Sequence, residues 1–89
     1  MAKFDGVKGY LLLEIEKSPK EVTLVFRDNR FLFISTEEGE IVLDGDDVEG
    51  SEVEGVSETV GQLEVRFKDG KKLVAKSTVG KLQSESIPE

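Results

Sequence analysis

Hydrophobic residues stand at every second position on both sides of a short turn in two stretches of the chain, residues 21–36 and 62–77. In the second stretch Leu63, Val65 and Phe67 are separated by single charged residues. Successive side chains of a β-strand point to opposite faces, so this alternation gives a strand with one apolar and one charged face. The pattern predicts half-buried antiparallel strands.

Turn-forming residues stand at the centre of each stretch. They are Asp28-Asn29 in the first stretch and Asp69-Gly70 in the second. These residue types tolerate positive φ, which both central positions of a type I′ turn require, and that turn matches the twist of paired strands. We therefore expect each stretch to form a β-hairpin whose apolar face must be covered.

The second hairpin repeats the first at an offset of 41 residues without a gap, and the apolar positions on both sides stay in step. We interpret this as two copies of one β unit within a single domain, about residues 7–47 and 48–84. The alternative is two hairpins of ordinary β composition that fall in phase by chance. Six positions are identical in the two copies: Val7, Gly9, Phe26, Asp28, Leu32 and Gly39 with their partners.

Each unit is expected to hold a first strand, a hairpin and a short fourth strand. In the first unit these span residues 9–17, 21–27 with 30–36, and 40–43; in the second they span 50–57, 63–68 with 71–76, and 81–83. The pattern predicts an all-β fold, a small antiparallel barrel or sandwich of six to eight short strands with pseudo-twofold symmetry. The tail after Leu82 is expected to be frayed.

The apolar residues of the first strand are three apart, Leu12 and Ile15 in one copy and Val53 and Val56 in the other. This spacing does not fit a regular strand, so it predicts a β-bulge, with a short helical turn as the competing interpretation. The predicted core comprises Val7, Leu12, Ile15, Val22, Leu24, Phe26, Leu32, Ile34 and the residues 41 positions later.

Composition removes several kinds of chemistry. The chain has no Cys and no His, so disulfides, thiolate metal sites and the commonest catalytic bases are absent. Glycine-rich phosphate-binding motifs are also missing, and we expect no cofactor and no enzyme activity. A hydrolase that works with carboxylates stays as a remote alternative. The N-terminus does not resemble a secretory signal and no apolar run is long enough to span a membrane, so we expect a cytoplasmic protein.

The two copies differ on their second faces. The first copy carries apolar residues where the second carries mainly charged ones, and such a patch is typical of an interface. Three alternatives remain open: a homodimer interface, a site for a different protein, or a surface covered by the chain's own N-terminal segment or its Ile87-Pro88 tail. The candidate interface residues are Leu11, Leu13, Val25, Phe31 and Phe33, with the two Phe residues as anchors.

Acidic residues dominate the middle of the chain. The net charge is −7, and residues 37–58 hold ten acidic residues and no Lys or Arg. This distribution argues against direct nucleic-acid binding, which needs clustered cations. A solvated turn explains the acidic residues better than a metal site does, because the EF-hand spacing is missing. The candidate acidic surface comprises Asp44, Asp46, Asp47, Glu49, Glu52 and Glu54.

These observations favour a non-enzymatic protein-interaction or homodimerisation module. The alternative is an acidic inhibitor or nucleic-acid mimic that occupies the basic groove of a partner protein.

Overall fold

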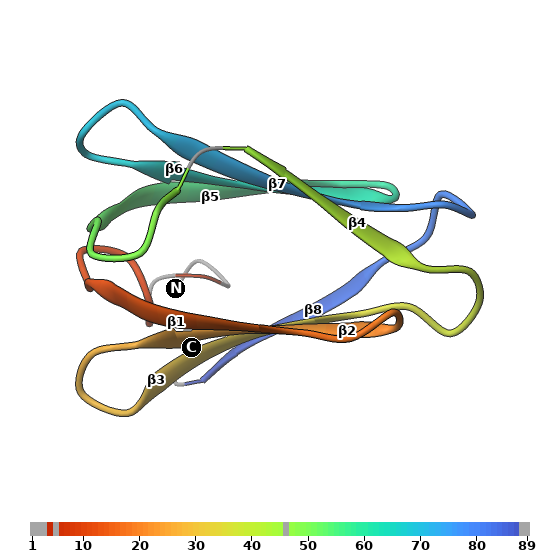
Figure 1. The fold of residues 1–89 in the computed structure, drawn as a ribbon, viewed down its shortest axis with the longest axis horizontal. Helices are drawn as coiled ribbons and strands as arrows, with labels where there is room; N and C mark the ends of the chain where they lie inside the picture. Colours follow the sequence, from red (N-terminus) through yellow and green to blue (C-terminus); the bar gives the residue numbers. More distant parts are fainter. Residues whose placement is uncertain (1–3, 5, 46, 88–89) are drawn as a thin grey trace.

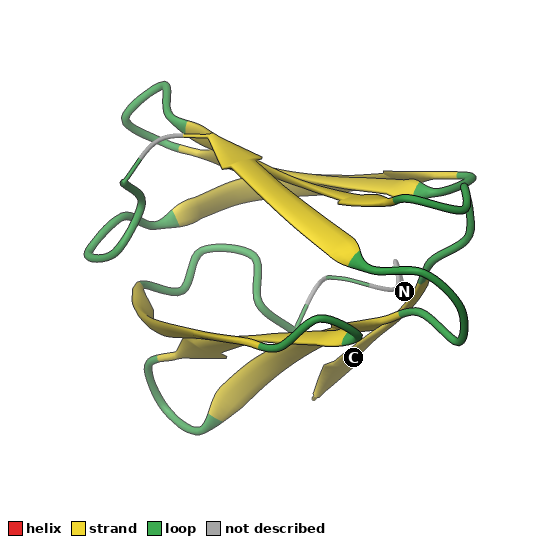
Figure 2. Ribbon diagram, turned by 45° about the vertical axis from the view of Figure 1, so that its right-hand side comes forward, coloured by secondary structure: helices red, strands yellow, loops and turns green. Residues whose placement is uncertain are grey.

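The computed structural model describes residues 4, 6–45 and 47–87, and within them it contains eight strands in two antiparallel sheets and no helix (Figure 1). The first sheet has the order β1-β2-β3-β8, with β1 at Leu12–Lys17, β2 at Glu21–Phe26, β3 at Arg30–Ser35 and β8 at Gln83–Ile87. The second has the order β4-β7-β6-β5, with β4 at Ile41–Gly45, β5 at Val53–Thr59, β6 at Gln62–Phe67 and β7 at Lys72–Ser77. The sheets lie face to face (Figure 2), so the all-β prediction is confirmed and the architecture is a sandwich.

Each hairpin receives its fourth strand from the other half of the chain. The first sheet is completed by β8, which pairs with β3 from Phe31↔Ile87 to Ser35↔Gln83. The second sheet is completed by β4, which pairs with β7. The chain therefore passes from the first sheet to the second after β3 and returns after β7.

The prediction that the tail after Leu82 is frayed is wrong. Residues 83–87 form β8, hydrogen-bonded to β3, and are not frayed. The prediction missed this strand because its sequence, Gln-Ser-Glu-Ser-Ile, has no apolar residue at an inward position. Ser86 takes that position and is only 1% exposed.

Both hairpins turn with three residues, one more than a type I′ turn. Phe26 pairs with Arg30, and the N–H of Phe67 donates to the carbonyl oxygen of Lys71 at 2.9 Å. The first turn has positive φ at Asp28 (67°) and Asn29 (59°), while the second has φ 88° at Gly70. The turn residues were correctly identified and the turn type was wrong, since residue preferences for positive φ do not set the loop length.

The bulges occur where the spacing of three predicted them. Pairing with the neighbouring strand shifts between Leu12 and Glu14 in β1 and between Val53 and Gly55 in β5. Each shift restores the inward direction of the next apolar residue, Ile15 or Val56, and both of these pack against the core. The helical alternative is wrong.

The core lies between the sheets. Phe26 and Phe67 are 1% and 2% exposed and are the largest fully buried side chains, so replacing either by Ala would cost about 3–5 kcal/mol. Of the predicted core, Ile15 and Val56 are only partly buried, while Ile41 is an addition. The buried hydrophobic residues are Val7, Leu12, Val22, Leu24, Phe26, Leu32, Ile34, Ile41, Val48, Val53, Leu63, Val65, Phe67, Leu73 and Ala75.

The two halves are joined by backbone hydrogen bonds where β1 and β5 begin. The N–H of Leu12 donates to the carbonyl oxygen of Ser51 at 2.9 Å, and the N–H of Val53 donates to that of Tyr10 at 3.1 Å. Leu12 and Val53 are 41 residues apart, as are Tyr10 and Ser51. The contact thus follows the offset of the sequence repeat, although a duplication remains an interpretation of the sequence.

No helix in the described residues has the length and apolar character to cross a membrane.

Candidate interaction surface

The outward-pointing side chains of the first sheet form the candidate surface, which we call the aromatic face. Strand pairing arranges them in three rows across the sheet, because residues opposite one another in a sheet point to the same side. The rows are Glu14-Val25-Phe31-Ile87, Glu16-Thr23-Phe33-Glu85 and Glu21-Ser35-Gln83. The apolar residues of the first row, Val25, Phe31 and Ile87, lie side by side on neighbouring strands. We call these three residues the apolar column.

Phe31 and Phe33 make direct contact on β3. Their ring centroids are 5.8 Å apart and the ring planes differ by 19°, a stacked arrangement. Phe31 is half-buried and Phe33 is 37% exposed. The contact holds the two rings in fixed positions at the surface, which lowers the entropy cost of covering them.

The sequence prediction placed five residues on this surface. Val25, Phe31 and Phe33 lie on adjacent strands of the aromatic face, and Leu13 is 51% exposed in the bulge of β1. Leu11 precedes β1, is half-buried and forms an isolated bridge with Glu52. It therefore belongs to the junction of the two halves.

Ile87 also belongs to the aromatic face, although the sequence pattern did not place it there. This residue is 43% exposed and pairs with Phe31, so it extends the apolar column. The strand order shows that β8 continues the sheet beside β3 and leaves the rings of β3 open. Pro88, which the covering-tail alternative also invoked, lies outside the described residues. The sequence of β8 has no alternation of apolar and polar residues that would have indicated a strand.

The outer side of the second sheet has a different character. Its strand pairs bring Arg66 opposite Lys72, Gln62 opposite Lys76, and Glu64 opposite Val74. Arg66 and Glu64 form an ion pair at 3.3 Å. The two faces of the sandwich are thus distinct, one mainly charged and one with an aromatic centre.

The predicted acidic surface is spread over several elements. Asp44 is exposed in β4, Asp47 and Glu49 are exposed between β4 and β5, and Glu54 is exposed in β5. Glu52 forms an ion pair with Lys68 at 3.0 Å. Asp46 lies outside the described residues. Within the part of the chain that is described, no group of three acidic residues is placed to hold a metal ion.

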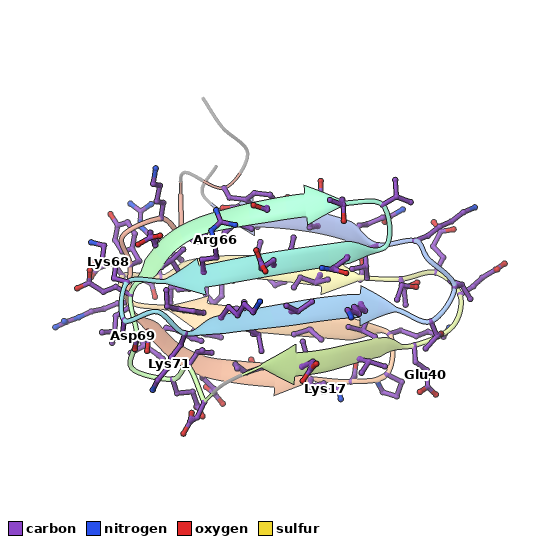
Figure 3. All side chains as sticks on the ribbon, turned by 90° about the horizontal axis from the view of Figure 1, so that it is seen from above. Lys17, Glu40, Arg66, Lys68, Asp69 and Lys71 are labelled. Atoms are coloured by element: carbon purple, nitrogen blue, oxygen red, sulfur yellow. The ribbon has the colours of Figure 1, made fainter. Side chains whose placement is uncertain are left out.

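Cations gather at the β6–β7 turn, at one end of the sandwich (Figure 3). Lys68, Asp69 and Lys71 lie together there, and Lys71 Nζ donates to the carbonyl oxygen of Asp47 at 3.2 Å. The hydroxyl of Ser51 donates to Asp69 Oδ2 at 2.7 Å, and the backbone N–H of Lys71 donates to Oδ1 at 3.1 Å. Both bonds favour the carboxylate and lower the pKa of Asp69 below its ordinary value of 3.8. Asp69 is a structural residue that ties this turn to the start of β5.

A hollow of about 330 Å³ lies beside the connection from β7 to β8. It is lined by Thr36, Glu37, Glu38, Val79, Lys81, Leu82 and Gln83. The lining mixes acidic, basic and neutral residues. Some of its polar groups bond to one another, since the hydroxyl of Thr36 donates to the carbonyl oxygen of Glu38 at 2.7 Å. This hollow has no convergent set of free polar groups, so the aromatic face remains the candidate surface.

Comparisons with known protein families, with curated proteins and with solved structures found no match.

Proposed function

We propose that this protein is a non-enzymatic interaction module that binds another polypeptide chain through the aromatic face. The observation that carries the proposal is the stacked pair Phe31 and Phe33 at the outer surface of a sheet, with Val25 and Ile87 in the same row as Phe31. Buried aromatic anchors supply much of the binding energy of protein interfaces. Strands with apolar side chains on both faces are typically covered on both sides.

The contrast between the two outer faces supports this choice. Both sheets come from similar hairpins, yet the positions of Val25 and Phe31 are taken in the second sheet by Arg66 and Lys72. The second set is sufficient for a stable outer face, so the fold does not require aromatic residues there. Their presence on one face is best explained by contact with a partner.

The exposed parts of three side chains set the scale of the interaction. Leu13, Phe33 and Ile87 are 51%, 37% and 43% exposed. Covering a whole apolar side chain contributes about 1.5–3 kcal/mol, so covering these three remainders would contribute roughly 2–4 kcal/mol. At about 1.4 kcal/mol for each factor of ten, this improves the Kd by roughly 30- to 700-fold.

Site-specific photo-crosslinking in host-cell extract tests the proposal. A photoreactive phenylalanine analogue at position 33 is expected to give a discrete protein adduct, and the same group at Val60, which is 92% exposed in the β5–β6 turn, is expected to give none. Excess wild-type protein should suppress the adduct, and excess Phe31→Ser/Phe33→Ser protein should not. Equal competition by both proteins would overturn the proposal, provided that circular dichroism shows the variant to be folded.

The acidic residues in the middle of the chain give weaker support to the alternative function, that of a nucleic-acid mimic. A mimic of nucleic acid needs carboxylates in a row with their charge available, whereas Glu52 is paired with Lys68, and Lys71 reaches the backbone beside Asp47. The mimic stays a prediction from sequence that no contact of these residues favours.

A further inference from the structure

The aromatic face is negatively charged as well as apolar. Its three rows contain Glu14, Glu16, Glu21 and Glu85, and no Lys or Arg stands at any of the outward strand positions in these rows. Glu14 begins the row that ends at Ile87, and Glu16 and Glu85 stand at the two ends of the row of Phe33. The apolar column is therefore bordered by carboxylates at the outer strands.

Among the nearby cations, Arg27 is exposed just after β2, whereas two others are directed away from these rows. Arg30, at the start of β3, donates from Nη1 to the carbonyl oxygen of Gly6 at 2.6 Å and lies 3.9 Å from the ring centroid of Tyr10. Lys17 pairs with Val22, in an inward row at the end of β1. By contrast, Glu64 of the second sheet has Arg66 beside it at 3.3 Å. Within the described residues the four carboxylates of the rows form no ion pair, so their charge is left for an external partner.

Two shallow hollows lie on either side of Phe33. One has a volume of about 300 Å³ and is lined by Glu21, Val22, Thr23, Phe33, Ile34 and Ser35. The other, of about 160 Å³, is lined by Phe33, Ser35, Gln83, Ser84 and Glu85. Each combines one carboxylate with the edge of an aromatic ring and with neutral groups. This is the environment that a Lys or Arg side chain prefers, with its stem against apolar atoms and its charge near an acid.

The volumes favour single side chains over a compact ligand. Sites for small molecules usually enclose about 300–1,000 Å³ and bury most of the ligand. The hollows beside Phe33 are at or below the lower end of this range, and both are lined by Phe33 and Ser35. A polypeptide that lies across β3 reaches both hollows with side chains on either side of one apolar residue.

A second copy of the same face is a poor occupant. A twofold dimer places a patch against itself, so it would bring the four carboxylates of one copy toward the four of the other. Like charges at an interface oppose association, and the three described rows hold no cation to offset them. A cationic partner gains from the same four charges.

We propose that the aromatic face binds a cationic polypeptide segment in which an apolar side chain packs over Phe33 while Lys or Arg side chains enter the hollows bordered by Glu21 and Glu85. This inference rests on the proposed function and names the chemical class of the partner. A cation beside Phe31 and Phe33 also gains from the negative face of the aromatic ring. Binding is therefore both apolar and sensitive to salt.

Fluorescence anisotropy with three labelled, end-blocked octapeptides tests the inference. In each peptide Ser takes every second position, and the remaining positions, which share one face of an extended chain, alternate Arg with Val in the first peptide, Arg with Ser in the second and Glu with Val in the third. The first peptide is expected to bind at least about tenfold more tightly than the second, and the third is expected not to bind. Raising the salt concentration from about 0.05 to 0.3 M should weaken binding of the first peptide. Failure of the Arg-Val peptide to bind, or preference for the Glu-Val peptide, would overturn the inference.

Matched variants separate the local charge from the total charge. Glu21→Gln/Glu85→Gln is expected to weaken binding of the Arg-Val peptide about tenfold, whereas Glu49→Gln/Glu54→Gln, which removes the same charge from exposed positions elsewhere, should leave it within about twofold. Phe33→Ser should weaken it as well, with Val60→Ser as the control. Equal effects of the two double variants would overturn the inference.

The two proposals fail in different ways. If Phe33→Ser weakens binding and the two Glu double variants behave alike, the interaction module stands and its cationic partner does not. A dimer in light scattering that Phe33→Ser converts to a folded monomer would also replace the cationic segment by a second copy. If the photo-crosslinking experiment shows no dependence on Phe31 and Phe33, the proposed function itself is lost.

Discussion

A close contact between two turns offers the sharpest test of the fold. Gly61 lies in the β5–β6 turn with φ 76°, and a Cβ placed on it would come within 2.6–2.7 Å of the backbone of Gly80 in the β7–β8 connection. Carbon atoms in favourable contact are about 3.5–4.0 Å apart, so the added methyl group overlaps its neighbour by about 1 Å. The obstacle is backbone, which has no rotamer to change. Gly61→Ala is therefore expected to destabilise the protein.

Two glycines provide controls for the strain of positive φ. Gly70 has φ 88° and Gly80 has φ 74°, and a Cβ at either would meet nothing within 4 Å. Each Ala substitution costs about 1–2 kcal/mol from the left-handed conformation, offset by about 0.4–1 kcal/mol because the unfolded chain becomes less flexible. Gly61→Ala adds the overlap, which costs about 1–3 kcal/mol more.

Urea and thermal denaturation followed by circular dichroism measure these differences, since the chain has no Trp. The extra 1–3 kcal/mol expected for Gly61→Ala corresponds to a Tm about 4–24 °C below that of Gly70→Ala. It is a large part of the roughly 4–13 kcal/mol that a domain of this size has in total. Equal losses in the three variants would refute the reasoning, because they would show that the β7–β8 connection moves away freely.

Three further predictions concern polar contacts and the last strand. Asp69→Asn should make the free energy of unfolding fall less steeply as the pH is lowered. The pKa of Asp69 is lowered in the folded state, so the contribution of this carboxylate to stability is complete above the unfolded value of 3.8 and is lost as the pH falls through the folded value. Urea midpoints at about pH 7 and about pH 3 measure this, and a wild-type profile no steeper than that of Asp69→Asn, with Asp28→Asn as control, would contradict it. Thr36→Val should cost about 1–2 kcal/mol in urea denaturation, because the buried Thr36 hydroxyl donates its one hydrogen to the carbonyl oxygen of Glu38 (2.7 Å) or of Lys81 (3.1 Å). A loss no larger than that of the exposed Thr59→Val would disprove this. Ending the chain after Leu82 should abolish cooperative unfolding in circular dichroism, since β3 would lose the strand on one side; an unchanged transition would show that β8 is dispensable.

The hairpins, bulges and most of the core follow from local patterns in the sequence. Alternation around Phe26 and Phe67 defines which residues point inward, and both are buried. The spacing of three after Leu12 and Val53 identifies the bulges because only an extra residue keeps the next apolar side chain inward. These features depend on neighbours in the chain, and local patterns record them well.

The arrangement of the fourth strands does not follow from local patterns. Pairing of β3 with β8 joins residues 48 to 56 positions apart, and nothing near either strand specifies the other. Ser86 occupies an inward position at 1% exposure, so the polar sequence of β8 hides its burial. For the same reason the candidate surface was predicted as far as Val25, Phe31 and Phe33, while Ile87 and the carboxylate of Glu85 became visible only in the sheet.

The exchange of β4 and β8 between the sheets makes each half of the chain incomplete without the other. A fragment that ends before β5 would have β1, β2 and β3 with an open edge at β3, and its β4 would have no strand to join. We therefore expect that neither half folds on its own and that the two sheets form together in one cooperative step. Mixed in equal amounts, the two fragments should restore the sandwich, since each supplies the strand that closes the other's sheet. The aromatic face would be rebuilt in the same step, because its row from Glu14 to Ile87 draws on both fragments.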